Sequence, residues 1–128
     1  MIAIWEVVAL GAGVMVVAAV ACSRTAATKP NVAAELAKDP GTFILDVRSE
    51  GEFAQGHLER AVLIPIQQLP GRLQELPADK RTGVLVYCAM GGRSAVAASL
   101  IKARGYSSVH DLSGGIRAWE NAGLPVVK

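Results

Sequence analysis

Short strand-like runs that alternate with helical stretches are the feature of this sequence that most constrains its fold. The runs cover residues 42–45, 61–64, 83–87 and 108–112. The first three are apolar without regular polar alternation, which is typical of strands buried on both faces of a sheet. Strands that alternate with helices assemble into a layered α/β structure. The sequence therefore predicts an α/β fold with a mainly parallel central sheet, flanked by helices on both faces.

Helix start and stop signals lie between the first runs. Asn31 can cap a short helix that ends before the turn at residues 39–41. Ser49 and Glu52 have the spacing of a capping box, which predicts a second short helix as far as about Gln55.

Three further helices are expected later in the chain. Leucines recur at helical spacing over residues 67–74, which predicts a helix there. Residues 94–104 form the clearest helix, because they are rich in alanine, basic in the last turn and followed by glycine. Residues 116–122 lie between a glycine pair and a Gly-Leu-Pro stop, so they predict a last helix.

The first 23 residues differ from the rest of the chain in charge. Their one ionisable side chain is that of Glu6, whereas the remaining 10 of the 11 acidic residues and all 13 basic residues follow. Residues 7–23 are uncharged, and with the apolar residues before Glu6 they approach the ~20 residues that cross a ~30 Å hydrocarbon layer. We therefore interpret residues 1–23 as a membrane anchor or signal segment, 24–31 as a linker and 32–128 as one α/β domain.

The flanking charges predict on which side of the membrane the domain lies. No Lys or Arg precedes the apolar segment, whereas Arg24 and Lys29 follow it, and this bias places the domain in the cytoplasm. Two alternatives remain open. Residues 19–23 resemble a bacterial lipoprotein cleavage box, in which Cys22 would carry lipid and hold the domain outside the inner membrane, and a cleaved secretion signal would release the domain.

Charge and cysteine usage exclude several classes of function. The formal net charge is +2, without a block of Lys and Arg, so we expect no nucleic acid as a partner. The two cysteines, Cys22 and Cys88, lie in such different contexts that we expect no disulfide between them, and no Cys/His spacing suits zinc. We therefore predict no metal site.

The loop after the run at residues 83–87 carries the strongest chemical signal. Cys88 follows this strand directly and precedes the clearest helix, and in parallel sheets ligands bind at the carboxyl ends of the strands. The positive end of that helix favours a thiolate, while Gly91 and Gly92 let backbone amides turn inward around an anion. Arg93 adds a fixed positive charge suited to an oxyanion. A buried structural cysteine is the alternative, but the combination predicts a nucleophile in an anion cradle.

Other polar residues have simpler interpretations. Asp46 and Arg48 follow a buried strand and can line the same rim as Cys88, although a structural ion pair between them is the favoured interpretation. His57 and His110 are interpreted as structural residues, since a preactivated thiolate needs no base. We expect Trp119 in the core, with its indole N–H bonded to a nearby carbonyl.

Several ordered motifs resemble the single-domain rhodanese family of sulfurtransferases, over about residues 32–125. The matching segments are Leu45-Asp46-Val47-Arg48 with Glu52-Phe53, Gly56-His57-Leu58 followed by Ala61 and Ile64-Pro65, Cys88-Ala89-Met90-Gly91-Gly92-Arg93-Ser94, Gly114-Gly115-Ile116-Arg117-Ala118-Trp119 and Gly123-Leu124-Pro125. One departure is Arg60, which stands where the family usually has glycine.

The resemblance implies a reaction for Cys88. The cysteine would take the outer sulfur of thiosulfate or another sulfane donor, become a persulfide and pass the sulfur to a thiol, a protein acceptor or cyanide. This reaction would require no metal and no organic cofactor. The loop residues that would bind the small anionic donor are Ala89, Met90, Gly91, Gly92, Arg93 and Ser94. The soft side chain of Met90 would screen the persulfide or contact the acceptor.

Two alternative functions remain open. One is a sulfur carrier or docking module without turnover of thiosulfate. The other is a cysteine phosphatase or arsenate reductase, but those related enzymes place five residues between the cysteine and the arginine, whereas this loop has the four residues 89–92.

Overall fold

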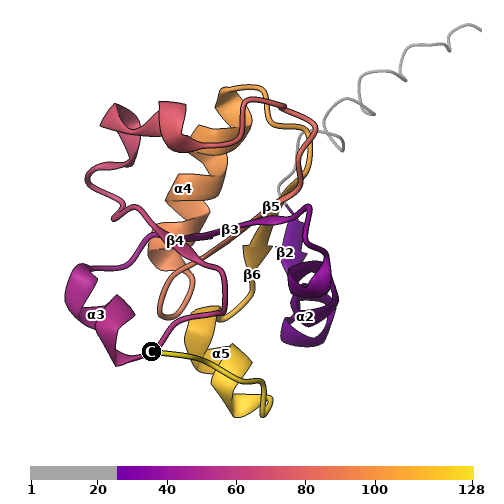
Figure 1. The fold of residues 1–128 in the computed structure, drawn as a ribbon, viewed down its shortest axis with the longest axis vertical. Coiled ribbons are helices and arrows are strands. Elements are labelled where there is room, and N and C mark those ends of the chain that lie inside the picture. The colour runs from indigo at the N-terminus through magenta and orange to yellow at the C-terminus, as the bar shows by residue number, and fades with distance from the viewer. Residues whose placement is uncertain (1–25) are drawn as a thin grey trace, which may run out of the picture.

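The computed structural model describes residues 26–128 (Figure 1). Within these residues five strands form one parallel sheet in the order β2-β6-β5-β3-β4. The strands are β2 (Ala26–Thr28), β3 (Phe43–Asp46), β4 (Val62–Leu63), β5 (Val84–Tyr87) and β6 (Val109–Leu112). The helices are α2 (Pro30–Lys38), α3 (Glu50–Gln55), α4 (Gly92–Ala103) and α5 (Gly115–Asn121), with 3₁₀ turns η1 (Leu69–Gly71) and η2 (Leu73–Glu75).

Two apolar cores lie on the two faces of the sheet. Strand residues such as Leu45 and Val86 pack with α4 and the two 3₁₀ turns on one face. Their neighbours Ile44 and Leu85 pack with α2 and α5 on the other face, because successive side chains of a strand point to opposite sides. Figure 1 shows α4 on one side of the sheet, and α2 with α5 on the other. The α/β fold predicted from the sequence is therefore confirmed.

The chain enters the sheet earlier than the sequence predicts. Residues 26–28, which were interpreted as part of a linker, form the edge strand β2 and pair with β6. Helix α2 then starts at Pro30, and its N-cap residue is Lys29. The interpretation of Asn31 as the cap is therefore wrong. The physical reason is that proline presets the helical φ angle and needs no hydrogen-bond acceptor at the first helical position.

The leucine-rich segment at residues 67–74 is not an α-helix. It forms the two 3₁₀ turns η1 and η2 instead, because Pro70 has no N–H and Gly71 follows it. The sequence pattern was right about burial, since Leu69, Leu73 and Leu76 all lie in the core on the α4 face.

The predicted membrane segment at residues 1–23 lies outside the described residues. Among residues 26–128, no helix is both long enough and apolar enough to cross a bilayer.

Arg60 shapes the turn that leads from α3 into β4. Its φ angle is +71°, a left-handed conformation that glycine adopts more readily, which fits the family's usual glycine at this position. Its guanidinium donates to the carbonyls of Ala37, Asp39 and Thr42, at 2.6, 3.1 and 3.3 Å. Arg60 thereby supplies a donor to the carbonyl of Ala37 in the last turn of α2, where a helix leaves its carbonyls unpaired.

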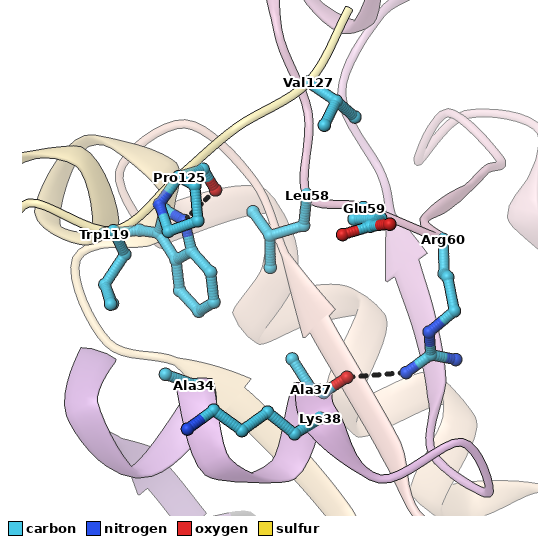
Figure 2. A pocket seen from close by; sticks show the side chains of 10 residues that line it. Ala34, Ala37, Lys38, Leu58, Glu59, Arg60, Trp119, Pro125 and Val127 are labelled. Atoms are coloured by element: carbon cyan, nitrogen blue, oxygen red, sulfur yellow. Dashed lines mark hydrogen bonds between the residues drawn. The ribbon is translucent and has the colours of Figure 1, made fainter.

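A cavity of about 330 Å³ lies between Arg60 and the C-terminal segment (Figure 2). Leu58 and Trp119 form much of its apolar wall. Trp119 is buried, and its indole Nε1 donates to the carbonyl of Pro125 at 2.8 Å. The expected core position of Trp119 is confirmed.

Candidate active site

Cys88 lies at the carboxyl end of the central strand β5, at the start of the loop that leads into α4. Gly91 is the N-cap of α4 and has a φ angle of +119°, which is strained for any residue with a side chain. This conformation reverses the chain within three residues and turns backbone N–H groups toward the cysteine. The backbone of Gly91 donates to the Cys88 sulfur at an N–Sγ distance of 3.0 Å.

Ser94 supplies the side-chain contact to the sulfur. It is fully buried in the first turn of α4, and its hydroxyl oxygen lies 3.4 Å from Cys88 Sγ. The same hydroxyl donates to the carbonyl of Gly91 at 3.2 Å. A thiol can donate to Ser94 Oγ, whereas a thiolate can only accept, so the Ser94 hydroxyl must rotate toward the sulfur when Cys88 ionises.

The environment of Cys88 favours the thiolate. Burial raises the pKa of the thiol, but hydrogen bonds from the Ser94 hydroxyl and from the backbone amides of Ser94, Gly91 and Met90 outweigh burial and lower the pKa below its ordinary value. Cys88 is 1% exposed, so the sulfur lies at the bottom of the loop. The amide cradle expected from the sequence is present around it.

Arg93 is engaged differently from the sequence expectation. Its guanidinium forms two hydrogen bonds with the carboxylate of Glu52 in α3, at 2.7 and 3.0 Å. This contact is the main reason that the pKa of Glu52 falls to about 2, with a smaller lowering from Ser49 that offsets burial. The positive charge of Arg93 is thus close to the loop, but it is neutralised by a carboxylate.

Glu52 is a site residue that the sequence indicates only as part of a capping box and of the Glu52-Phe53 motif segment. The capping box is present, with Ser49 Oγ accepting from the Glu52 backbone and the Glu52 carboxylate accepting from the Ser49 backbone. The second role was missed because Arg93 is 41 positions away in sequence. No local spacing indicates a pair of this kind.

The start of α5 fixes the active-site loop through backbone hydrogen bonds. The N–H groups of Ile116 and Arg117 donate to the carbonyls of Cys88 and Ala89, at 2.9 and 3.1 Å. With these carbonyls directed toward α5, the loop amides are free to face the sulfur. Gly115 allows the close approach, because a Cβ atom there would lie 2.4 Å from the Ala89 carbonyl. The sequence analysis placed this glycine pair only at the turn before the last helix, and α5 in fact begins at Gly115.

Asp46 and Arg48 form a buried ion pair. Arg48 Nη2 lies 2.7 Å from the Asp46 carboxylate and also donates to the carbonyl of Gly56 at 2.7 Å. Its guanidinium also lies over the ring of Tyr87, 5.5 Å from the centroid. The pair ties the end of β3 to the end of α3 and to β5, which agrees with the structural interpretation of these two residues rather than a role at the rim.

The side chains of the remaining candidates make other contacts or are exposed. His57 stacks on the Phe53 ring, and its Nδ1 is 3.0 Å from the Phe53 carbonyl. His110 contacts Ser108, and burial lowers the pKa of His110. Met90 is 64% exposed at the tip of the loop, which leaves its side chain available to a partner. Within residues 26–128, no group of three His, Cys, Asp or Glu side chains could hold a metal ion.

The fold and the site together define an α/β domain with a buried cysteine in a backbone amide cradle. The model of the rhodanese-like domain family matches residues 29–122. The chain therefore belongs to the rhodanese-like domain family.

Known relatives point to sulfur transfer at the level of the family. A sulfurtransferase of Allochromatium vinosum is 38% identical over 92 residues, which cover 72% of this chain and 84% of the relative. The crystal structure of a rhodanese-related protein from Thermoplasma volcanium has a TM-score of 0.72 and 31% sequence identity, and the match covers 80% of this chain and 97% of that chain.

Other relatives carry the domain as part of a longer chain. A thiosulfate sulfurtransferase structure from Pseudomonas aeruginosa has a TM-score of 0.71 and 28% identity, with 82% of this chain and 20% of that chain covered. The tRNA uridine(34) hydroxylase of Yersinia pestis is 31% identical over 100 residues, which cover 72% of this chain and 28% of the relative. This chain therefore spans less than a third of either protein.

Proposed function

We propose that this protein is a sulfurtransferase that carries sulfane sulfur as a persulfide on Cys88. The observation that carries the proposal is the pair of contacts at Cys88 Sγ: the Gly91 amide donates to the sulfur at 3.0 Å, and the Ser94 hydroxyl oxygen lies 3.4 Å from it. Donors that stabilise a thiolate also stabilise the terminal sulfur anion of a persulfide. Membership of the rhodanese-like family and similarity to a sulfurtransferase support the same chemistry.

The first half-reaction loads the sulfur. The Cys88 thiolate attacks the outer sulfur of thiosulfate, a new S–S bond forms, and the bond to the sulfonate breaks so that sulfite leaves with the electron pair. With a persulfide donor the leaving group is a thiolate instead. The sulfur's depth in the loop favours a narrow donor that presents its terminal sulfur end-on.

The second half-reaction unloads the sulfur. An acceptor thiolate attacks the terminal sulfur of the Cys88 persulfide, the acceptor becomes a persulfide, and Cys88 leaves as the thiolate that the loop stabilises. Cyanide would accept the same sulfur to give thiocyanate. Met90, exposed at the loop tip, is placed to contact an acceptor.

A second candidate function, a sulfur carrier with little turnover of thiosulfate, is favoured by the Glu52–Arg93 contact. The Glu52 carboxylate accepts the hydrogen bonds of the Arg93 guanidinium that would otherwise bind a dianionic donor. Donors with less negative charge, such as a persulfide on a partner protein, need this guanidinium less. Comparison of turnover with thiosulfate and with a persulfide donor separates the two functions.

The direct test is detection of the Cys88 persulfide. After incubation with a sulfur donor, we expect a mass gain of one sulfur atom on the peptide that contains Cys88, reversible by a reductant. Cys88→Ser should abolish both the mass gain and sulfur transfer with the fold retained, while Cys22→Ser serves as the matched control. Turnover that persists in Cys88→Ser would contradict the proposal, and hydrolysis of phosphate esters would point to a phosphatase.

We further propose that residues 1–23 attach the domain to a membrane, with the domain in the cytoplasm. The proposal rests on their apolar sequence and on Arg24 and Lys29 after it. We expect the protein to sediment with membranes and Cys88 to react with an impermeant thiol reagent only in opened cells. Labelling in intact cells would contradict the orientation, and lipid on Cys22 in the mature protein would establish a lipoprotein.

A further inference from the structure

Asp111 is a partly buried acid that the proposed reaction does not use. It lies in β6, and its Oδ1 is a buried polar atom without a hydrogen-bond partner among the described residues. Such atoms are rare in folded proteins because they lose the hydrogen bonds that water would supply. Burial raises the pKa of Asp111, and a hydrogen bond with the Ser94 side chain opposes that rise.

Sheet register places Asp111 beneath α4. Asp111 pairs with Val86 of β5, and side chains of paired residues in adjacent strands point to the same face. Val86 packs in the core on the α4 face together with Cys88 and Ala97. The Asp111 carboxyl therefore points toward α4, where Ser94 is buried in the first turn.

Asp111 has uncharged partners in the sheet. Its strand neighbours, Ala27 of β2 and Val86 of β5, carry no charge. Arg93, the charged residue next to Ser94 in α4, is turned away to Glu52.

Ser94 has one hydroxyl proton and several acceptors for it. The Gly91 carbonyl accepts at 3.2 Å and the Cys88 sulfur lies at 3.4 Å. The Asp111 carboxyl, on the face of the sheet that α4 covers, is the third. One hydroxyl donates one hydrogen bond at a time. An ionised Asp111 therefore draws the proton away from the sulfur, while a protonated Asp111 leaves it to the sulfur and can itself donate to Ser94 Oγ.

We propose that Asp111 is a positioning residue for Cys88: its carboxylate competes with the sulfur for the hydroxyl proton of Ser94 and so limits the fraction of Cys88 that is thiolate. The proposal concerns the cysteine of the proposed function but does not depend on the reaction that the cysteine carries out. Cys88 and Asp111 then titrate as a coupled pair, which favours one negative charge over two. Protons only are exchanged, between the two acids and solvent.

The test measures the protonation of Cys88 by NMR in the full chain labelled with ¹³Cβ-cysteine, with Cys88→Ser to assign the resonance. Asp111→Asn keeps the shape of the side chain, carries no charge and offers an amide donor to Ser94 Oγ. We expect it to lower the Cys88 pKa by about one unit, a gain of up to ~10-fold in thiolate at pH values below the pKa. Asp111→Ala should shift the pKa in the same direction, and Asp79→Asn, an exposed aspartate variant, should leave it unchanged.

A double-variant cycle tests the route through Ser94. In the Ser94→Ala background, Asp111→Asn should shift the Cys88 pKa much less than in the wild-type background. Equal shifts in both backgrounds would mean a direct effect of charge and would overturn the role of Ser94. An unchanged or raised Cys88 pKa in folded Asp111→Asn and Asp111→Ala would overturn the proposal. The experiment measures the protonation of Cys88 and not sulfur transfer. Its outcome therefore does not decide the sulfurtransferase proposal, which the persulfide experiment tests.

Discussion

Arg93 and Glu52 decide how much positive charge the active-site loop presents to a donor. Their side chains are 37% and 35% exposed, so a donor can compete with the carboxylate for the guanidinium. The hydrogen bonds between them, at 2.7 and 3.0 Å, are charge-assisted and have the paired geometry in which Arg binds oxyanions. A dianionic donor must therefore displace Glu52 or bind without Arg93.

Glu52→Gln should release Arg93 to the donor. Glutamine keeps the capping box with Ser49, so the helix α3 should be unaffected. We expect the KM for thiosulfate to fall by about fivefold, equivalent to roughly 1 kcal/mol for a partly exposed charge contact. Steady-state kinetics measure the change, with Glu50→Gln, the exposed acid two positions earlier, as the matched control. Arg93→Ala added to Glu52→Gln should remove the gain, and a gain that persists would contradict this account.

Helix α5 contributes to the site through its backbone alone. Its first amides bond the carbonyls of Cys88 and Ala89, and Gly115 makes room for that contact with a φ angle of +65°. The loop conformation thus depends on an element that supplies no side chain to the sulfur.

Gly115→Ala should disrupt this docking, because the new Cβ would lie 2.4 Å from backbone atoms of Ala89 that cannot move independently. We expect the free energy of unfolding to fall by more than about 2 kcal/mol, the sum of a backbone shift and a left-handed alanine. Gly123→Ala is the matched control, since its φ angle is +81° but nothing lies within 4 Å of its Cβ position. It should cost only about 1 kcal/mol. Urea unfolding measures both values, and equal losses would refute the steric argument.

Arg60 couples the turn before β4 to the end of α2. Arg60→Ala keeps the left-handed backbone and loses the hydrogen bonds to Ala37, Asp39 and Thr42, whereas Arg60→Gly loses the same bonds but relieves the strain. We expect the alanine variant to be less stable than the glycine variant by about 1 kcal/mol. Thermal or urea unfolding of the two variants measures this difference. If the alanine variant is the more stable one, the left-handed backbone at position 60 is not strained.

Across the whole molecule, sequence reasoning identified the parts that are encoded locally. The apolar run that forms β5, the capping box of Ser49 and the loop from Cys88 to Ser94 each carry their signal within a few residues, and the structure has all of them. Strand β2 was missed because three small residues carry no apolar pattern, and its pairing with β6 joins positions more than 80 residues apart.

The same limit applies to the site. The loop amides that point toward the Cys88 sulfur could be predicted, because glycines next to a helix start favour this arrangement. The Glu52–Arg93 contact and the support from α5 depend on how distant segments pack, and no spacing in the sequence encodes them.

The edge strand β2 should contribute to the stability of the entire domain. We compare two shortened chains, one of residues 24–128 and one of residues 29–128. The second lacks β2, including the hydrogen bond from Ser113 N–H to the Thr28 carbonyl, and leaves β6 as an open edge. We expect its free energy of unfolding to be lower by about 2 kcal/mol, from the loss of several hydrogen bonds of ~0.5–1.5 kcal/mol each. Equal urea midpoints of the two chains would show that β2 does not contribute to stability.

The two hydrogen bonds from Ile116 and Arg117 to the cysteine loop also fix an order of events during synthesis. A nascent chain that has left the ribosome only as far as β6 already contains Cys88, Gly91 and Ser94, but the carbonyls of residues 88 and 89 still lack their partners. The loop that lowers the pKa of Cys88 can therefore be completed only after α5 has left the ribosome, so we expect the thiol of a growing chain to keep its ordinary pKa until then.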